Sequence, residues 1–371
     1  MMHDLFYSMK DKPFLLMESS PSFTNWQPVS KQKKPGIAEL AALQTVAHGA
    51  DSVLYFQWRA SAARRKNSTR CHRPRWAGGC PFFYGDCAGR ARTGDLAEIT
   101  AVKREKQAAI VHDWQNKWAL EGSCGPRNAG MGYWDELKRH YNALAREGIA
   151  VEFVDQNADL TGYGLVVVPM LYLLTDAFAK KLCAFAQSGG TVIVTYWSGV
   201  VDESDLCRLG DTPYGLTELL GLRRTEIDGM YDGETRRCVP SAGCTLPAAL
   251  ASTLCEVAAL DEKDPAEPLS LYEEDYFAGH PAAAVHRYGK GRAYYLASRF
   301  DEAFYRAFYH DAAKEIGLSP AWPEALPEGV LAVRRGSFVF VQNCTEQPAT
   351  VGNTVLDRYR TAVWKGKDRI F

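Results

Sequence analysis

The sequence has no hydrophobic run long enough to span a membrane. A spanning helix needs about 20 apolar residues, but the longest apolar run, 165–174, is interrupted by Pro169. The start of the chain carries Asp4 and Asp11 and has no extended apolar core, so it does not have the composition of a secretory signal. We therefore expect neither membrane insertion nor secretion.

An excess of charge of one sign is also missing. Lys and Arg total 43, Asp and Glu total 44, and the net charge is −1. Binding to nucleic acid or to an anionic membrane usually depends on an excess of positive charge, so we expect no nucleic-acid and no membrane partner. Apolar residues make up 46% and charged residues 23% of the chain, which excludes a disordered or fibrous protein. A length of 371 residues suggests about two or three domains.

The ten cysteines show no repeated spacing. In a chain of this size, scattered cysteines indicate reduced thiols, so we expect a cytoplasmic protein. A zinc site is conceivable in one cluster, which consists of Cys71, His72, Cys80 and Cys87. Its spacings match no recognised finger pattern, so no metal site is predicted.

Residues 61–95 contain no Val, Ile, Leu or Met. The segment holds eight basic and two acidic residues, and three of the ten cysteines. A stretch without aliphatic side chains is a poor candidate for an amphipathic helix or a core strand. It is therefore a long loop, a metal-binding insert, or sequence that is not native.

Two patterns of strands and helices flank this segment. Before it, a strand at 13–17 ends in Glu18, a helix follows at 37–48, and a second strand follows at 52–58. In a (β/α)₈ barrel, the chemistry lies at the carboxyl ends of such strands. After it, short apolar runs alternate with segments of helical periodicity, which predicts a parallel α/β sheet. The predicted strands are 108–112, 151–154, 165–171, 191–196 and 293–297, and the predicted helices are 133–146, 176–187 and 302–316. From Gly329 onward the chain is predicted to be β-rich.

Specific runs of residues resemble one enzyme family. KPFLLMESSPS at 12–22, followed by TNWQP at 24–28, resembles the nucleophile region of glycoside hydrolase family 42, the β-galactosidases. YFQWR at 55–59 is similar to the next barrel strand of that family. WALEGS at 118–123 and TYWSG at 195–199 resemble its trimer-forming domain, which has an amidotransferase-like α/β fold.

The resemblance implies a partial barrel followed by two further segments. We expect the C-terminal remnant of a (β/α)₈ barrel at 1–105, an amidotransferase-like parallel α/β domain at 106–318, and a small C-terminal β domain at 319–371. The family barrel has six earlier strands, so the sequence is interpreted as a C-terminal fragment. The implied assembly is a homotrimer.

The family's activity is hydrolysis of terminal β-D-galactosides with retention of configuration. The resemblance places Glu18 at the nucleophile, and it places Trp26 and Phe56 in the apolar wall around galactose. Retention needs a second carboxyl group about 5–5.5 Å away. The family's general acid/base is the Glu of an Asn-Glu pair, and no residue here matches it. The mechanism needs no organic cofactor, and the fragment is expected to be inactive.

Two interpretations from other classes stay open. One is a non-catalytic oligomerisation protein that keeps only the trimer-forming domain. The other is an amidotransferase-like enzyme, for which 122–125 (GSCG) offers a Gly-Ser-Cys run. A nucleophile elbow needs a strand before it and Gly at the position that Pro126 occupies, which disfavours this enzyme.

We hypothesise that residues 64–95 are a misread frame. Back-translation of Arg65–Thr69 with permitted codons, read two bases later, gives Glu-Lys-Phe-His, a family run that is otherwise missing here. Similar shifts restore apolar residues at helical spacing up to Asp95, although more than one insertion or deletion is needed. The alternative is a genuine basic loop. Resequencing the gene tests the hypothesis, and an error-free reading that confirms every codon would end it.

Overall fold

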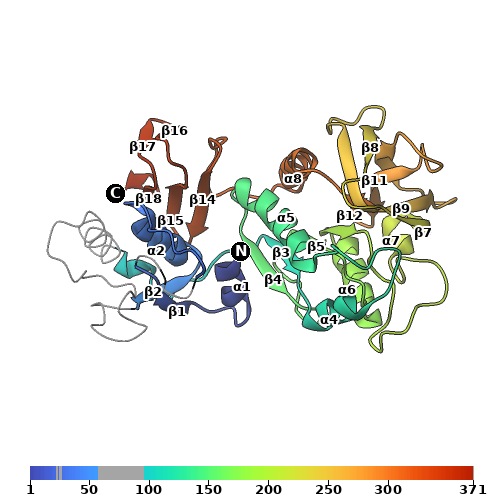
Figure 1. The fold of residues 1–371 in the computed structure, drawn as a ribbon, viewed down its shortest axis with the longest axis horizontal. Coiled ribbons are helices and arrows are strands. Elements are labelled where there is room, and N and C mark those ends of the chain that lie inside the picture. The colour runs from blue at the N-terminus through green and yellow to red at the C-terminus, as the bar shows by residue number, and fades with distance from the viewer. Residues whose placement is uncertain (22–23, 25–26, 57–95, 371) are drawn as a thin grey trace. The chain divides into compact units, whose positions relative to one another are not determined.

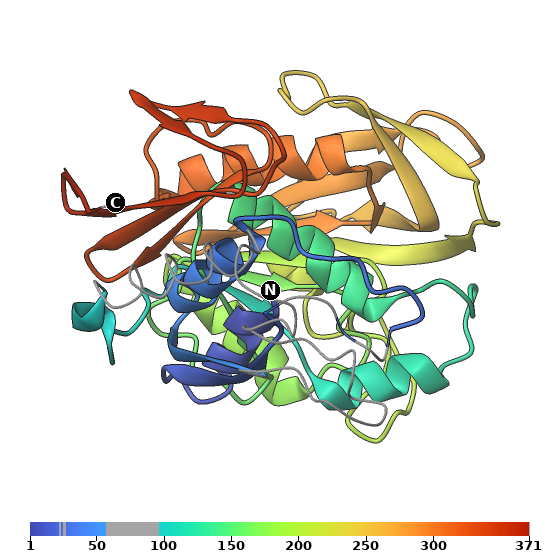
Figure 2. The ribbon, with the colours of Figure 1, turned by 60° about the vertical axis from the view of Figure 1, so that its left-hand side comes forward.

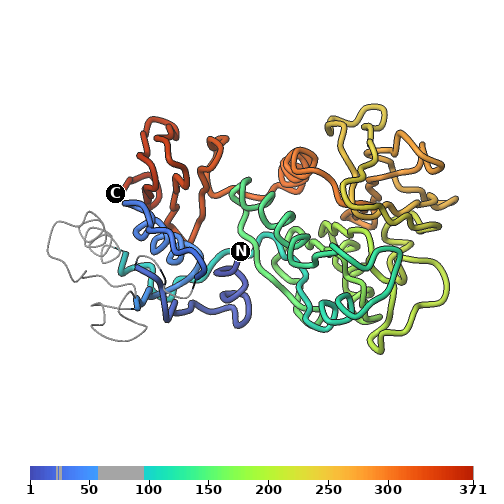
Figure 3. The backbone as a smooth tube through the Cα atoms, viewed as in Figure 1, coloured from blue at the N-terminus to red at the C-terminus, as the bar shows by residue number. Residues whose placement is uncertain are grey.

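The computed structural model describes residues 1–21, 24, 27–56 and 96–370. Trp26, the cysteine and histidine cluster at 71–87 and the segment 64–95 lie outside the described residues. Contacts divide the chain into two compact units (Figures 1 and 3). Unit 1 consists of Met1–Glu105, Gly148–Ala150 and Pro320–Phe371, and unit 2 consists of Lys106–Glu147 and Val151–Ser319. The three-part division of the sequence stays a prediction, whose first and third segments both lie in unit 1.

The N-terminal part of unit 1 contains two parallel strands backed by a helix. Its elements are α1 (Met2–Ser8), β1 (Phe14–Ser19), α2 (Ile37–Ala47) and β2 (Ala50–Tyr55). β1 and β2 pair in parallel, with α2 as the crossover between them. This is one β-α-β unit of the kind from which barrels are built. Helix α2 ends at Ala47, and Gly49, with φ of 108°, reverses the chain into β2.

The C-terminal part of unit 1 is an antiparallel sheet that packs against the same helix. Its strands are β14 (Val330–Arg335), β15 (Phe338–Asn343), β18 (Thr361–Lys365) and β19 (Asp368–Arg369), and a hairpin is formed by β16 (Ala349–Val351) and β17 (Thr354–Leu356). Phe338 and Phe340 of β15 share a buried cluster with Leu43 and Val46 of α2. The short helix η2 (Ala97–Ile99) closes this cluster.

One buried arginine ties the two parts of unit 1 together. The Arg335 side chain, at the end of β14, is fully buried. Its guanidinium donates to the carbonyls of Val46 at 2.9 Å and Ala50 at 2.7 Å, and it pairs with Asp51 at 2.5 Å. Because the last carbonyls of a helix have no partner within the helix, the C-terminal sheet supplies a hydrogen bond that α2 lacks.

The core of unit 2 is a parallel sheet with helices on both faces. Its strands are β3 (Ala108–Val111), β4 (Val151–Val154), β5 (Leu165–Val168), β6 (Thr191–Thr195) and β12 (Gly291–Leu296), and its main helices are α4 (Trp114–Gly122), α5 (Tyr133–Arg146), α6 (Asp176–Gln187), α7 (Thr217–Leu220) and α8 (Glu302–Ile316). The spatial order is β4-β3-β5-β6-β12, a doubly wound arrangement. Helices α6 and α7 cover one face, and α5 and α8 pack together on the other (Figure 2).

An antiparallel extension continues the same sheet beyond β12. It contains β7 (Leu222–Gly229), β8 (Thr235–Pro240), β9 (Ala249–Leu260), β10 (Glu267–Tyr272), β11 (Pro281–Tyr288) and β13 (Ser298–Arg299). β11 pairs with β12 and thereby joins the extension to the parallel sheet. Sequence analysis assigned no element to this region, but the predicted fold class, a mixed α/β protein with a C-terminal β part, is confirmed by the structure and the structural relatives.

Candidate active site

The first candidate site lies at the carboxyl ends of β1 and β2. The strands are in register so that Ser19 pairs with Tyr55, and the amide of Phe56 donates to the carbonyl of Ser19 at 3.1 Å. Residues paired across parallel strands point to the same side, and successive residues alternate. In β1 a register shift between Leu16 and Ser19 interrupts this alternation. The pairing places Glu18 and Phe56 at the same strand ends, each next to one member of the Ser19–Tyr55 pair.

Several apolar side chains of the two strands are exposed near Glu18. Leu15 is 54% and Met17 is 68% exposed in β1, and Phe56 is 37% exposed after β2. In contrast, Val53, which pairs with Leu16, packs against the cluster that contains α2. Glu18 itself is exposed. The structure thus brings two of the three predicted site residues together, at the same strand ends, while Trp26 is outside the described residues.

The loop between β1 and α2 is held against the C-terminal sheet. Lys34 pairs with Glu346, and Arg360 pairs with the buried carboxylate of Glu39 at 2.6 Å, in the first turn of α2. Gln342 donates to the carbonyl of Leu40 at 3.4 Å. These contacts fix the helix behind the two strands, and through it the edge where Glu18 and Phe56 lie.

The second candidate lies in unit 2, outside the carboxyl ends of β3 and β5. In doubly wound sheets, ligands bind at the point where the strand order reverses, which here lies between β3 and β5. The fully buried Asn116 donates to the carbonyl of Met170 at 3.1 Å and accepts the amide of Leu173 at 2.9 Å. Gln156 donates to the carbonyl of Leu173 at 3.1 Å. Amide side chains bonded to the protein's own backbone therefore fill this edge.

The turn after β6 has a tryptophan, not a nucleophile, at its left-handed position, and the hydroxyl of the buried Ser198 accepts the amide of Leu171 at 3.0 Å. Trp197 has φ of 57°, a left-handed conformation that costs energy for a residue with a side chain. Its amide donates to Glu256 at 3.0 Å, and its buried ring stacks on Tyr172 with centroids 5.7 Å apart. Cys124 follows helix α4 rather than a strand. Neither position has the strand, nucleophile and turn that amidotransferase-like chemistry requires.

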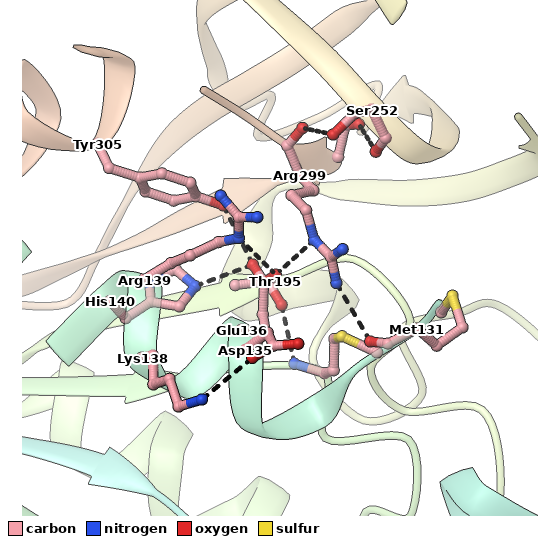
Figure 4. Close-up of polar contacts among 12 residues, drawn as sticks. Met131, Asp135, Glu136, Lys138, Arg139, His140, Thr195, Ser252, Arg299 and Tyr305 are labelled. Carbon is pink, nitrogen blue, oxygen red and sulfur yellow. Dashed lines mark hydrogen bonds and ion pairs between the residues drawn. The ribbon is translucent and has the colours of Figure 1, made fainter. Parts of the chain in front are cut away.

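A buried carboxylate, Glu136, organises polar side chains beside this turn (Figure 4). It is fully buried in the first turn of α5 and accepts hydrogen bonds from Arg299 at 2.9 Å and from the hydroxyls of Tyr196 and Tyr305 at 3.1 Å. Burial alone would raise the pKa of Glu136, but His140 and Arg299 outweigh it and lower this pKa to about 2. Because no solvent reaches Glu136, we assign it to stability rather than to ligand binding.

This low pKa predicts how acid affects unit 2. The folded pKa lies below the ordinary value of 4.5, so the contribution of Glu136 to stability is complete above pH 4.5 and is lost as the pH falls toward 2. We expect a loss of about 2–3 kcal/mol over this range. Urea unfolding at pH 7, 4 and 3, compared with Glu136→Gln, measures it. The variant should show a shallower loss between pH 4.5 and 3, and equal slopes would contradict the prediction.

Within the described ranges, no group of three or more His, Cys, Asp or Glu side chains could hold a metal ion. The structure also contains no described helix that is both long enough and apolar enough to cross a bilayer. The seven cysteines that the structure describes are free thiols, at positions 124, 183, 207, 238, 244, 255 and 344.

Comparison with known proteins matches both units to one family. A family model described as the β-galactosidase trimerisation domain matches residues 106–319, which is more than half of the chain and includes all of unit 2. A second model, described as β-galactosidase, matches residues 1–71 and therefore includes Glu18 and Phe56. The chain belongs to the β-galactosidases of glycoside hydrolase family 42. The resemblance inferred from the sequence is confirmed.

Individual family 42 relatives agree over almost the whole chain. The β-galactosidase BglY of Alicyclobacillus acidocaldarius is 44% identical over 95% of this chain and 52% of its own length. The β-galactosidase Pbg of Clostridium perfringens is 35% identical over 96% of this chain and 52% of its own length. The solved β-galactosidase of a Rahnella strain superposes with a TM-score of 0.93, at 39% identity, over 98% of this chain and 56% of that one. The chain thus spans about half the length of these family 42 relatives.

Sequence reasoning missed several residues that shape the two candidate sites, at the ends of β1 and β2 and at the ends of β3 and β5. Arg335, Asn116 and Gln156 were not predicted, because a polar side chain that bonds to distant backbone carries no local sequence signal. Trp197 was noticed only as part of a family-like run, and its left-handed backbone conformation was not foreseen. In contrast, Glu18 was singled out because residues 12–28 resemble the nucleophile region of the family.

Proposed function

We propose that this chain supplies the nucleophile half of a retaining β-galactosidase site. Glu18 would attack the anomeric carbon of a terminal β-galactoside and form a covalent galactosyl intermediate, which water then hydrolyses. The observation that supports this role is the position of Glu18 beside Phe56, at the carboxyl ends of paired parallel strands, within a segment that matches the β-galactosidase family.

Phe56 and Trp26 would form the apolar wall of the sugar site. The face of a pyranose that carries C–H groups packs on aromatic rings, and Phe56 presents an exposed ring next to Glu18. No organic cofactor and no metal ion takes part, because both chemical steps are carried by carboxyl groups.

The second carboxyl group is not found in this sequence. Retention requires a general acid/base about 5–5.5 Å from the nucleophile, and no residue of the 371 matches the family's Asn-Glu pair. We therefore propose that the 371-residue polypeptide is inactive alone, and that other barrel strands must complete its site.

A stereochemical experiment tests the proposed mechanism. The chain is combined with a polypeptide that carries the remaining barrel strands of a family relative, and the product is followed by proton NMR. A first product with the β-configuration would support a covalent intermediate on Glu18, whereas a first product with the α-configuration would contradict it.

We also propose that the chain assembles as a homotrimer through unit 2. The support is the match of residues 106–319 to a trimerisation domain. Light scattering at micromolar concentration should give three times the mass of 41.2 kDa, and a monomer would contradict the proposal. The same support keeps a second candidate, a non-catalytic oligomerisation protein, which predicts a trimer but no activity even after the barrel is completed.

The proposed location is the cytoplasm. Its support is the scattered cysteine usage and the free thiols of the described residues, which are typical of a reducing compartment. Cell fractionation that recovers the chain outside the cytoplasm would contradict this location.

A further inference from the structure

Two tryptophans form an exposed patch on α4 in unit 2. Trp114 is 45% and Trp118 is 61% exposed, and their ring centroids lie 6.3 Å apart, one helical turn from each other. We name these two side chains the tryptophan patch. Large aromatic side chains are rarely left in water without a reason, and they are enriched at the centres of protein interfaces.

Neighbouring side chains pack against Trp114 of the tryptophan patch. Trp134 of α5 meets Trp114 edge-on at 6.0 Å, and the buried ring of His112 meets Trp114 at 4.9 Å. The ammonium group of Lys117 lies 6.0 Å from the Trp114 ring centroid and pairs with Glu121 at 2.5 Å. Side chains that are already ordered lose little entropy when a partner binds, which favours a binding role.

A second apolar surface lies on the other side of the segment 170–174. Asn116 of α4 bonds to one side of this segment, and the amides of Gly199 and Val200 bond to the carbonyls of Leu171 and Tyr172. The loop that follows, 202–209, carries Leu206 at 64% and Leu209 at 91% exposure. We name this loop the leucine loop.

The leucine loop is also ordered. The carboxylate of Asp202 accepts the amides of Ser204 at 2.9 Å and Leu206 at 3.0 Å. Arg208 pairs with Asp176 at 2.8 Å and lies over the ring of Tyr214 at 4.5 Å. Two preformed apolar surfaces of different shape therefore flank one edge of unit 2.

We infer that the tryptophan patch of one copy of this chain packs against the leucine loop of the next copy. This inference rests on the homotrimer proposed above and names the surfaces that build it. Contacts between two different surfaces are heterologous, and such contacts close into a ring when the rotation allows it. A three-membered ring requires this kind of contact, because a surface that pairs with itself gives only dimers.

The size of the two surfaces fits such an interface. The exposed parts of Trp114 and Trp118 amount to on the order of 250 Å², and the two leucines add to the opposite side. A stable interface buries roughly 800 Å² per partner, with a few aromatic anchors at its centre. The tryptophan patch has the area expected of that centre, and a second copy of the chain supplies a complementary apolar surface.

Charge substitutions test the two surfaces separately. Trp118→Lys and Leu209→Lys each place an ammonium group in the proposed contact, and both sites are exposed, so folding should be unaffected. We expect each variant of the full chain to be monomeric by light scattering, with the dissociation constant raised roughly 30-fold or more. Tyr231→Lys is the matched control, since Tyr231 is 82% exposed and lies in neither surface; it should stay trimeric.

Mixing the two variants distinguishes a heterologous contact from a symmetric one. A Leu209→Lys copy keeps an intact tryptophan patch, and a Trp118→Lys copy keeps an intact leucine loop. The equimolar mixture should therefore form a dimer with one copy of each. If Trp118 packed against Trp118, or Leu209 against Leu209, the mixture would give no such mixed dimer.

The remaining outcomes are equally decisive. A wild-type monomer would refute the homotrimer and this inference together. A wild-type trimer with Trp118→Lys or Leu209→Lys unchanged, or with Tyr231→Lys dissociated instead, would refute only the surfaces named here. Fluorescence quenching of the wild-type trimer by galactose or lactose, lost in Trp118→Lys while the mass is unchanged, would show a sugar as the occupant and overturn the inference.

Discussion

The 371-residue chain alone should hydrolyse lactose, whose leaving sugar needs protonation, no faster than buffer does. Two strands cannot enclose a sugar, and a nucleophile without a general acid gives little rate enhancement, because the leaving oxygen is not protonated. The Alicyclobacillus β-galactosidase is 44% identical to this chain over the part that the two share. When the chain is combined with the other part of that enzyme, we expect turnover at a level typical of enzymes, about 1–10³ per second.

Substitution of Glu18, the proposed nucleophile, provides the sharpest part of this test. Glu18→Gln in the combined enzyme should lower kcat by at least roughly 10³-fold, because the amide cannot form the covalent intermediate. Glu105→Gln is the matched control, since Glu105 is an exposed carboxylate of the same unit, and it should leave kcat unchanged. Ordinary turnover by the chain alone, lost on Glu18→Gln, would refute the proposed incompleteness of the site.

Arg299→Leu should produce the largest loss of stability in unit 2. The substitution leaves the fully buried carboxylate of Glu136 without its guanidinium partner. Removing one member of a buried ion pair costs about 3–5 kcal/mol. The imidazole of His140, 3.4 Å from Glu136, and the two tyrosine hydroxyls remain, so we expect the lower end of this range. Urea unfolding at pH 7 measures the difference through the transition midpoint at constant slope.

Two further variants show whether burial is the cause. Arg292→Leu breaks a partly exposed pair with Glu315, and such pairs contribute about 0–1 kcal/mol. The double variant Glu136→Leu with Arg299→Leu removes both charges and should recover much of the lost stability. If Arg299→Leu lowers the free energy of unfolding no more than Arg292→Leu does, the buried ion pair is not a major source of stability in unit 2.

The parallel sheet was predictable because its strands are buried on both faces. Leu165–Val168 and Thr191–Thr195 are continuous apolar runs, and such runs between helical segments indicate a parallel strand. The antiparallel extension gave no such signal. Its strand β9, with the sequence ALASTLCEVAAL, is rich in residues that favour helices, but pairing with β7, β8 and β13 imposes the extended form.

The candidate site was predictable only in part, and for a similar reason. Glu18 and Phe56 lie at the ends of short strands, so their neighbourhood follows from the parallel pairing of β1 and β2. The packing of α2 on the C-terminal sheet depends on Arg335, which is almost 300 residues away in sequence from the carbonyls it binds. Contacts at such separation leave no periodicity to detect.

The hydrogen bonds from Arg335 to the carbonyls of Val46 and Ala50 can form only late in synthesis. Residues 1–105 leave the ribosome before the sheet that caps α2, which is encoded after residue 319. The residues of unit 2 are synthesised by then, whereas Leu43 and Val46 of α2 cannot pack against Phe338 and Phe340 until β15 has been made. The nascent chain therefore exposes the apolar face of α2 until the C-terminal sheet has been synthesised.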